Sequence, residues 1–328
     1  AAVAVATAAA GVWLGCGTGQ AASRRVVLGV PVSPPLMVHI MPYVARDMGF
    51  FRKYNIEAEL LEFEGGPRGI RALIAGEVHL IGSSSEPIIE SIVAGAPVKM
   101  VFSYAHKLQS ALLARNVVKD LSDLRGRRIA INQFGTTNDI ALEAALKRGG
   151  LTLQDVEVVQ LPFADMNPAL ANRSIDVAQH NEPFMATAIE QGLAVRFRGV
   201  DEYYPYMQFS VIVYAPHLIR DQPEAARRWM VAYLRGVRDY NDAFLKGIGK
   251  EEVVRDLMKH VPLRDPTLFD KMIPVGLDPD GKVNVEGLRN DLRWFVEHGL
   301  VTQPPDLDRV VDTSFAEYAV SRLGPYPR

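Results

Sequence analysis

The chain has 328 residues, a length that suits two domains and allows each of them to bury a core of its own. Its 48% of hydrophobic and 23% of charged residues are ordinary for a globular protein. The formal net charge of -2, together with the lack of any basic tract, gives no indication of a nucleic-acid partner.

Residues 1–22 have the composition of an export signal or a lipoprotein leader. Residues 1–14 carry no charge and are rich in Ala and Val, and a run of small and polar residues follows them. Cys16 is the only cysteine, which excludes an internal disulfide and a multi-cysteine metal site. Its position just after the apolar run resembles a bacterial lipobox, although Trp13 stands where Leu is usual. Lipidation of Cys16, plain cleavage near Ala22 and a buried thiol remain alternatives.

From residue 26 the chain alternates short apolar runs with amphipathic segments, which indicates strands alternating with helices. The first series predicts strands at 26–30, 56–63, 78–81, 98–102 and 111–114, and helices at 42–51, 68–75 and 88–94. A second, similar series follows a turn at 121–126. It predicts strands at 129–132, 156–161, 175–179, 194–197 and 209–214, and helices at 140–148, around 168–171 and at 183–191. Alternation of this kind implies mainly parallel sheets with helices on both faces.

Beyond residue 214 the pattern is helical. A long amphipathic helix is predicted at 223–246, and shorter helices are predicted at 251–259, 266–272 and 285–298. A helical tail that follows two α/β lobes usually packs back on the first lobe. The expected boundaries therefore assign 24–108 and 211–328 to lobe one, and 109–210 to lobe two.

The loop that follows the predicted strand at 129–132 has the makeup of a small-molecule site. It offers hydroxyls and amides, Gly135 lets a ligand approach the backbone, and the next helix directs its free N–H groups at the same spot. The alternative is that Thr136 or Thr137 only caps the helix, with Asp139 completing a capping box from Thr136. A similar strand, polar loop and helix occur around residues 82–87, which argues for the ligand-site interpretation.

Several kinds of chemistry are not indicated. The chain lacks a phosphate-binding G-x-x-x-x-G-K-[ST] loop, a G-x-G-x-x-G dinucleotide turn and a G-x-S-x-G nucleophile elbow. Its seven histidines never stand four residues apart, so we expect neither a metal site nor a cofactor. Ser84 and Ser85 are expected to cap a helix and not to act in catalysis. Glu182 either accepts a hydrogen bond from a ligand or is simply placed favourably at a helix N-terminus.

Five stretches of the sequence, taken in their order along the chain, match a known pattern. They are PYVARDMGFF at 42–51, ALIAGEVH at 72–79, DLRGRRI at 123–129, IDVA at 175–178 and EPF at 182–184. In that order they resemble the periplasmic substrate-binding proteins of ABC importers for nitrate, sulfonates, taurine and thiamine-precursor pyrimidines. One departure is His79, where the family often has Asp. The resemblance implies a type II periplasmic-binding-protein fold of class α/β, with two lobes that close on a ligand and a helical C-terminal region.

Carried over position by position, the resemblance implies that six loops bind the ligand and that no residue is catalytic. The residues expected at the site are Ser33, His39, Gly65, Gly66, Ser84, Ser85, Gln133, Phe134, Gly135, Thr136, Thr137, Asn138, Phe163, Asn181, Glu182 and Phe184.

The leading hypothesis is a non-catalytic, monomeric protein that captures a small solute outside the inner membrane and presents it to the permease of an ABC importer. The expected location is periplasmic or extracytoplasmic, with a lipid anchor if Cys16 is lipidated. The alternative is an enzyme on the same fold, of the pyrimidine-precursor or menaquinone-pathway type. The fungal pyrimidine synthases carry a cysteine-rich iron motif, whereas this chain has one cysteine in its leader.

The loops suggest two kinds of ligand. Helix N-termini with hydroxyl and amide donors suit a carboxylate or sulfonate, and the rings of Phe134, Phe163, Phe184 and Tyr204 could hold a flat ligand. Among cations, only Arg68 borders a candidate loop, which argues against a doubly charged anion. If Thr137 and Ser85 donate to one ligand from opposite lobes, alanine at either position should weaken binding about 5- to 30-fold.

Overall fold

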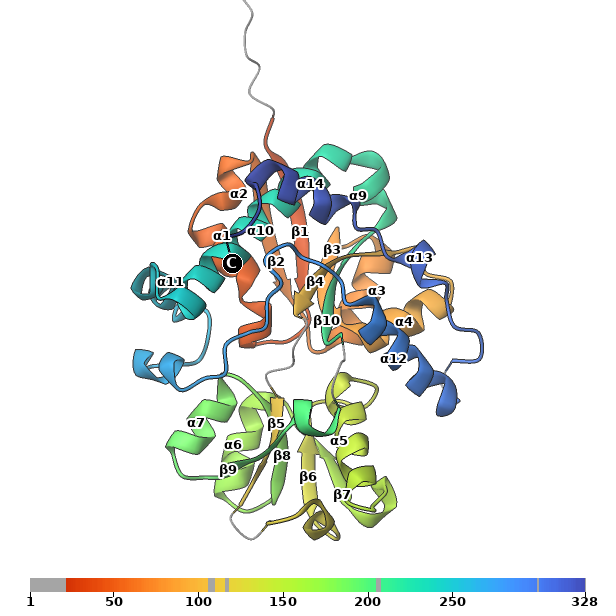
Figure 1. Ribbon diagram of the computed structural model, residues 1–328, viewed down its shortest axis with the longest axis vertical. Coiled ribbons are helices and arrows are strands. Elements are labelled where there is room, and N and C mark those ends of the chain that lie inside the picture. The colour runs from red at the N-terminus through yellow and green to blue at the C-terminus, as the bar shows by residue number, and fades with distance from the viewer. Residues whose placement is uncertain (1–21, 106–109, 116–117, 205–207, 300, 328) are drawn as a thin grey trace, which may run out of the picture.

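The computed structural model describes residues 22–105, 110–115, 118–204, 208–299 and 301–327, so nearly all of the predicted leader, including Cys16, lies outside the described residues. Two five-stranded sheets form the centres of two lobes (Figure 1). Sheet one has the order β2-β1-β3-β10-β4 and sheet two has the order β7-β6-β8-β5-β9. The strands of sheet one are β1 (Arg24–Val30), β2 (Ile56–Glu62), β3 (Leu80–Ser84), β4 (Lys99–Ala105) and β10 (Ser210–Tyr214). Those of sheet two are β5 (Ser110–Ala114), β6 (Arg128–Ile131), β7 (Glu157–Gln160), β8 (Val177–Asn181) and β9 (Val195–Gly199).

Each sheet has one reversed strand. In sheet one, β1 pairs in parallel with β2 and β3, while β10 runs antiparallel between β3 and β4. In sheet two, β6 pairs in parallel with β7 and β8, while β5 runs antiparallel between β8 and β9. The reversed strand is in both cases the one that enters from the other lobe. The chain therefore passes between the lobes once between β4 and β5 and once between β9 and β10.

Helices flank both sheets, as the alternating pattern predicts (Figure 1). Lobe one carries α1 (Met41–Asp47), α2 (Phe50–Lys53), α3 (Gly66–Ala75) and α4 (Ser85–Val93), and lobe two carries α5 (Thr137–Arg148), α6 (Phe163–Ala171), α7 (Phe184–Glu190) and α8 (Val200–Tyr203). The C-terminal helices are α9 (Pro216–Asp221), α10 (Pro223–Lys246), α11 (Lys250–Leu257), α12 (Val285–Glu297), α13 (Leu307–Val310) and α14 (Ser314–Leu323). Short 3₁₀ turns are η1 (Met37–His39), η2 (Leu121–Leu124), η3 (Leu153–Asp155) and η4 (Pro266–Asp270). None of the helices in the described ranges has the length and apolar character needed to cross a bilayer.

The C-terminal helices pack on elements of sheet one and its flanking helices. Helix α10 contacts α1, α2 and α14, and Trp229 of α10 stacks on Tyr233 with ring centroids 5.0 Å apart. Val311 forms an isolated parallel bridge with Met100 of β4. The ring of Phe315 lies edge-on against that of Tyr214 in β10. Large aromatic side chains of α10 thus fill the core beneath sheet one.

Four predicted elements differ from the structure. The helix predicted at 42–51 is interrupted because Gly49 adopts a φ of 77°, so that one helix ends at Asp47 and the next begins after Gly49. The strand predicted at 78–81 instead spans Leu80–Ser84, because these residues pair with β10. The segment predicted as a helix around 168–171 begins five residues earlier, and that at 266–272 is a 3₁₀ turn. Helix α14 was not predicted.

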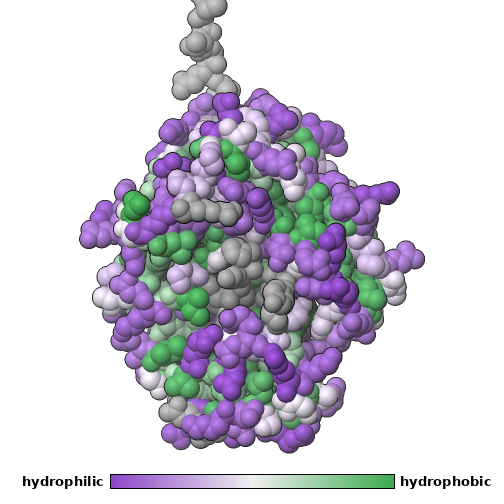
Figure 2. All heavy atoms as spheres, viewed as in Figure 1, coloured by the Kyte–Doolittle hydropathy of each residue, from purple (hydrophilic) through white to green (hydrophobic). Residues whose placement is uncertain are grey.

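The surface seen in Figure 2 is mostly hydrophilic on both lobes, and its hydrophobic side chains lie in small separate groups. Such a distribution is ordinary for a globular protein. A cavity lies between the two lobes.

Candidate ligand site

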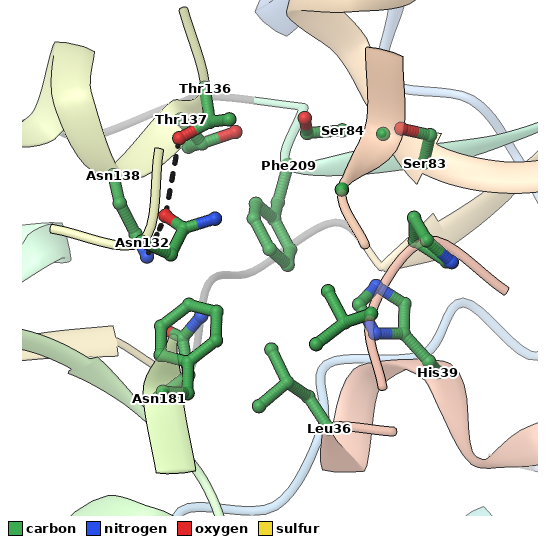
Figure 3. A pocket seen from close by; sticks show the side chains of 15 residues that line it. Leu36, His39, Ser83, Ser84, Asn132, Thr136, Thr137, Asn138, Asn181 and Phe209 are labelled. Atoms are coloured by element: carbon green, nitrogen blue, oxygen red, sulfur yellow. Dashed lines mark hydrogen bonds between the residues drawn. The ribbon is translucent and has the colours of Figure 1, made fainter. Parts of the chain in front are cut away.

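A cavity of about 50 Å³ lies where the two lobes meet (Figure 3). Because one water needs about 10–15 Å³ of such space, the cavity in this conformation has room for only a few water-sized molecules. The lining residues are Pro31, Val32, Leu36, His39, Gly65, Gly66, Ser83, Ser84 and Phe209 on the side of sheet one, and Asn132, Thr136, Thr137, Asn138, Phe163 and Asn181 on the side of sheet two.

Among the described residues, the lining of the cavity carries no charged side chain. Within that part of the chain it contains no Asp, Glu, Lys or Arg, and its single titratable group is the imidazole of His39. Burial lowers the pKa of His39 to about 3, because the charged imidazolium would lose its hydration, so this ring is neutral at physiological pH. The electrostatic field in the cavity therefore comes from hydroxyls, amides and backbone dipoles.

Three helices begin at the cavity with first turns that no side chain caps. Their N-cap residues are Gly65 for α3, Ser84 for α4 and Thr136 for α5, and none of these makes a side-chain cap hydrogen bond. A helix N-terminus exposes free N–H groups and carries a partial positive charge. In α4 these donors are used up, because the N–H of Ser85 donates to the carbonyl of Phe209 at 3.3 Å and Pro87 has no N–H. The ends of α3 and α5 therefore present hydrogen-bond donors to an electron-rich group of a ligand.

The capping box considered as the alternative for α5 does not form. The hydroxyl of Thr136 donates to the carbonyl of Gln133 at 2.8 Å, and Asp139 accepts from the backbone N–H of Gly135 at 2.9 Å. The positive φ of 69° at Gly135 lets the chain turn so that this N–H faces Asp139. The loop is thus shaped by its own hydrogen bonds, which leaves the first turn of α5 without a side-chain cap.

Three polar atoms of the lining are buried and lack a hydrogen-bond partner within the described residues. They are Nδ1 of His39, Oγ of Ser83 and Oδ1 of Asn181. Figure 3 shows His39 and Ser83 on one side of the cavity and Asn181 on the other. Leaving a buried polar group unpaired costs about 1–3 kcal/mol, so such groups are rare without a reason. All three lie around one cavity and are available for hydrogen bonds with a molecule that enters it.

A hydrogen-bonded network holds Asn181 in place. Its backbone N–H donates to Nδ1 of His180 at 3.2 Å, so the proton of this neutral ring is on Nε2, which lies 2.9 Å from Oδ1 of Asn167. Burial lowers the pKa of His180 to about 3. The ring of His180 is stacked between those of Phe163 and Phe184, at centroid distances of 5.9 and 5.8 Å. The network fixes the backbone at Asn181 and the ring of Phe163, both of which line the cavity.

Nine of the residues expected at the site line the cavity. They are His39, Gly65, Gly66, Ser84, Thr136, Thr137, Asn138, Phe163 and Asn181. The other seven lie outside its lining, namely Ser33, Ser85, Gln133, Phe134, Gly135, Glu182 and Phe184.

The residues outside the lining have other contacts. The hydroxyl of Ser85 donates to Asp291 of α12 at 3.0 Å, so Ser85 is directed away from the cavity. Ser85 and Thr137 therefore do not both face one ligand in this structure, contrary to the expectation. Ser33 donates to Glu62 at 2.6 Å. Phe134 is 47% exposed, and Phe184 packs on His180.

Glu182 is occupied at the start of α7. Its carboxylate accepts from the backbone N–H groups of Ala186 at 3.0 Å and Ile273 at 3.3 Å, in keeping with the alternative of favourable placement at a helix N-terminus. Burial raises the pKa of Glu182 to about 7. The side chain of Gln133 lies close to Gly65 across the cleft, where a Cβ at Gly65 would overlap it.

Six lining residues were not among those expected, namely Pro31, Val32, Leu36, Ser83, Asn132 and Phe209. Leu36 and Ser83 fall within loops that the resemblance implies. Asn132 directly follows β6, at the carboxyl end of a parallel strand where ligands of α/β proteins bind, and that position was the available signal. Phe209 could not be found from local pattern, because it reads as the start of an apolar strand.

Substituting Gly82 with Ala should lower the free energy of unfolding by about 1–3 kcal/mol, as overpacking of a core does. A Cβ at Gly82 would overlap the buried ring of Tyr104, whose hydroxyl donates to the carbonyl of His39 at 3.1 Å. Chemical denaturation measures the change. As a control on the same strand, Ser83→Ala adds no atom and removes an unpaired hydroxyl, so an equal loss in both variants would contradict the packing explanation.

In the described ranges, no group of three or more His, Cys, Asp and Glu side chains is arranged to hold a metal ion.

The sequence matches known binding proteins over part of its length. A protein of Brucella abortus that is named a binding protein is 27% identical over 205 residues, which are 61% of this chain and 62% of the relative. The taurine-binding periplasmic protein of Escherichia coli is 32% identical over 35% of this chain and 36% of its own. A riboflavin-binding protein of Chloroflexus aurantiacus is 28% identical over 60% of this chain and 55% of its own. The matches thus span less than two thirds of these relatives.

Solved structures share the fold at low sequence identity. The periplasmic aliphatic sulphonate-binding protein of Escherichia coli superposes with a TM-score of 0.70 at 20% identity, covering 88% of this chain and 92% of that one. The periplasmic nitrate-binding protein of Synechocystis has a TM-score of 0.70 at 16% identity, with coverage of 93% and 91%. A desulfurization enzyme also has this fold, with a TM-score of 0.66 at 15% identity and coverage of 91% and 99%.

The family described as NMT1/THI5 like matches residues 37–242, which is more than half of the chain. The matched residues include both passages of the chain between the lobes and most of the cavity lining. The two-lobed architecture, the topology of the two sheets and this match lead to one assignment: the chain belongs to the NMT1/THI5-like family and has the two-lobed fold of periplasmic binding proteins.

Proposed function

We propose that the protein is the extracytoplasmic solute-binding component of an ABC importer, which holds a small organic solute between its lobes and presents it to a permease. The observation that carries the proposal is the cavity lined from both lobes, where buried polar atoms of His39, Ser83 and Asn181 lack partners. The names of the relatives and of the structural neighbours support it. We further propose that the protein acts as a monomer, with lobe one at 24–108 and 211–328 and lobe two at 109–210.

Ligand capture by closure of the lobes follows from the distribution of the donors. The free N–H groups of α3 lie on one lobe and those of α5 lie on the other, so a ligand gains the full set of contacts only when the lobes approach. Binding then shifts the equilibrium toward the closed state. The strands near 102–105, 110–114 and 209–214 serve as the hinge in this proposal.

The ligand class proposed here is a small solute with one electron-rich group and a flat or apolar part. The uncapped N-termini of α3 and α5 favour a carboxylate, a sulfonate or a ring carbonyl, whereas the lack of charged groups among the described lining residues disfavours a multiply charged anion. The rings of Phe163 and Phe209 offer apolar surface to the remainder of the ligand. Organic sulfonates and carboxylates, pyrimidines and flavins are therefore the compounds to screen.

The proposal includes no catalysis. The lining offers hydroxyls, amides and one neutral imidazole whose lowered pKa makes it a weak base, and it contains no cysteine or carboxylate. Mass spectrometry before and after long incubation checks this point. Conversion of a bound compound into a product would favour the alternative, an enzyme on the same fold.

A thermal-shift screen with these four classes of compound tests the proposed function. A ligand that binds only the folded protein raises its stability by about 2.7 kcal/mol at a concentration 100 times its Kd. We expect members of one class to raise the melting temperature and to make the particle more compact in small-angle scattering. Stabilisation without any compaction would contradict capture by closure.

A further inference from the structure

Two buried carboxyl groups lie at the contact between the lobes, beside the cavity. Glu86 belongs to the first turn of α4, and Asp291 belongs to α12, which packs on α4; both have 0% exposure. Each carboxyl accepts a hydrogen bond from a residue that comes after a strand of sheet two in the sequence. The hydroxyl of Thr137 contacts Glu86, and the hydroxyl of Tyr204, which follows α8, donates to Asp291 at 2.9 Å. The lobes are thus held together through two carboxyls on one side and two hydroxyls on the other.

Glu86 and Thr137 are close enough to exchange two hydrogen bonds, an arrangement that a protonated carboxyl completes. Oγ1 of Thr137 lies 2.9 Å from Oε1 and 2.8 Å from Oε2 of Glu86. A hydroxyl has one hydrogen to donate, so two contacts of this length are both satisfied when one oxygen of the carboxyl carries a proton and donates it back to Thr137. A second negative charge on Asp291 nearby disfavours ionisation of Glu86 further.

Among the described residues, no cation compensates the pair from the elements that pack against α4. Asp291 receives hydroxyls from Ser85 and Tyr204 and has no ion-pair partner among the described residues. On α12, the nearby arginines pair with Glu286 at the surface, and on α3 one arginine pairs with Glu64 while the other is exposed; these residues are Arg289, Arg293, Arg68 and Arg71.

The remaining titratable groups on these helices are acidic or distant. Glu90 follows on α4, and Asp139 and Glu143 lie on α5. His298, just after α12, lies 3.7 Å from Glu143 and is partly exposed. On α5, Lys147 is exposed. The surroundings of the carboxyl pair therefore add negative charge and no buried positive charge.

We propose that Glu86 and Asp291 form a proton-dependent latch, in which closure of the lobes requires one proton held by the two carboxyls, so that solute capture weakens as the pH rises. This inference rests on the proposed function, because it concerns the closing of the same cleft. The latch regulates capture from outside the cavity, since neither Glu86 nor Asp291 lines it.

The direction of the pH effect follows from the burial of the pair. In the closed state, desolvation and the charge of Asp291 raise the pKa of Glu86 to about 8, and desolvation raises the pKa of Asp291 as well. When the lobes separate, water reaches Glu86 and its pKa returns toward the ordinary value near 4.5. A pKa that is higher in the closed state stabilises closure fully below the ordinary value, and this stabilisation is lost as the pH rises through the raised value. One linked proton changes the closed-to-open ratio by up to about 10-fold per pH unit.

Distance measurements between spin labels on the two lobes test the latch without any ligand. The full chain with Cys16→Ser carries labels at Ile74→Cys on α3 and Lys147→Cys on α5, both of which are exposed. For the otherwise unchanged protein, we expect the closed-to-open ratio to fall by at least 10-fold between pH 5.5 and pH 8.5. Glu86→Gln keeps a neutral hydrogen-bonding group and should hold the ratio constant over this range. Glu90→Gln, four residues further along α4, should titrate like the unchanged protein.

Two results would overturn the latch: distance distributions that do not change with pH in the unchanged protein, or a pH profile of Glu86→Gln equal to that of the control. Glu86→Ala provides a second variant, because it removes both the proton and the contact with Thr137 and should leave the lobes open at every pH. The experiment contains no ligand, so its failure is distinct from a failure of the proposed function, which would appear as no stabilisation by any compound in the screen.

Discussion

Replacing Asn181 with Leu should weaken ligand binding by about 5- to 150-fold and leave the free energy of unfolding of the ligand-free protein unchanged or higher. Oδ1 of Asn181 is buried at the cavity without a partner, so the native side chain costs stability until a ligand pairs with it. Leu is of similar size and has no group to leave unpaired. Loss of about 1–3 kcal/mol of binding free energy corresponds to the stated fold-change. Titration calorimetry with a ligand from the screen and chemical denaturation measure the two effects.

A matched control for this variant is Asn241→Leu. Asn241 is also buried, in α10, but its Nδ2 donates to the carbonyl of Leu277 at 3.1 Å. Replacement leaves that carbonyl unpaired and should lower the free energy of unfolding by about 1–3 kcal/mol, with no change in affinity. If both asparagine variants lost stability and kept full affinity, the unpaired atom at Asn181 would have no role in binding.

Replacing Trp229 with Ala should lower the free energy of unfolding by about 3–5 kcal/mol, the largest effect on stability expected from a single change in this chain. Trp229 is fully buried in α10, is stacked on Tyr233 and lies 5.5 Å from the ring of Phe51. Its removal leaves a large cavity beneath sheet one, which the surrounding helices cannot fill by small shifts. Thermal and chemical denaturation measure the loss.

The control for the core variant is Trp294→Ala. Trp294 lies on α12, is only partly buried and stacks on His298 near the surface. It should lose less than half as much stability as Trp229→Ala, because little of its contact area is in the core. An equal loss in both variants would show that burial in α10 is not what holds lobe one together.

The helices and strands were predictable from the sequence wherever Gly or Pro marks their ends. Helix α10 spans Pro223–Lys246, as predicted, because Pro223 suits its first turn and Gly247 ends it with a φ of 73°. The helices predicted at 42–51 and 266–272 were less accurate, since an internal Gly and a 3₁₀ geometry interrupt them. The mainly parallel sheets were predictable from the alternation alone.

The candidate site shows where local pattern stops being sufficient. Ser84 and Ser85 were both expected at the site, yet Ser84 lines the cavity while Ser85 donates to Asp291, which is 206 residues away in sequence. The cause is that β3 ends at Ser84 and α4 begins at Ser85, so the side chain of Ser85 is directed toward α12, which packs on α4. Phe209 reaches the cavity for a similar reason, because its place depends on which sheet the following strand joins. A sequence shows where polar loops occur, whereas the direction of each side chain depends on contacts with residues that are distant in the sequence.

The most direct test of the central claim, that a solute is held between the lobes, is native mass spectrometry of the protein purified gently from the cells that make it. We predict one small molecule per chain in part of the population, released unchanged on denaturation and lost from Asn181→Leu but kept by Asn241→Leu. Retention of the same molecule to the same extent by the Asn181 variant would contradict binding in this cavity. Absence of any retained molecule, together with no stabilisation by the screened compounds, would contradict the proposed function itself.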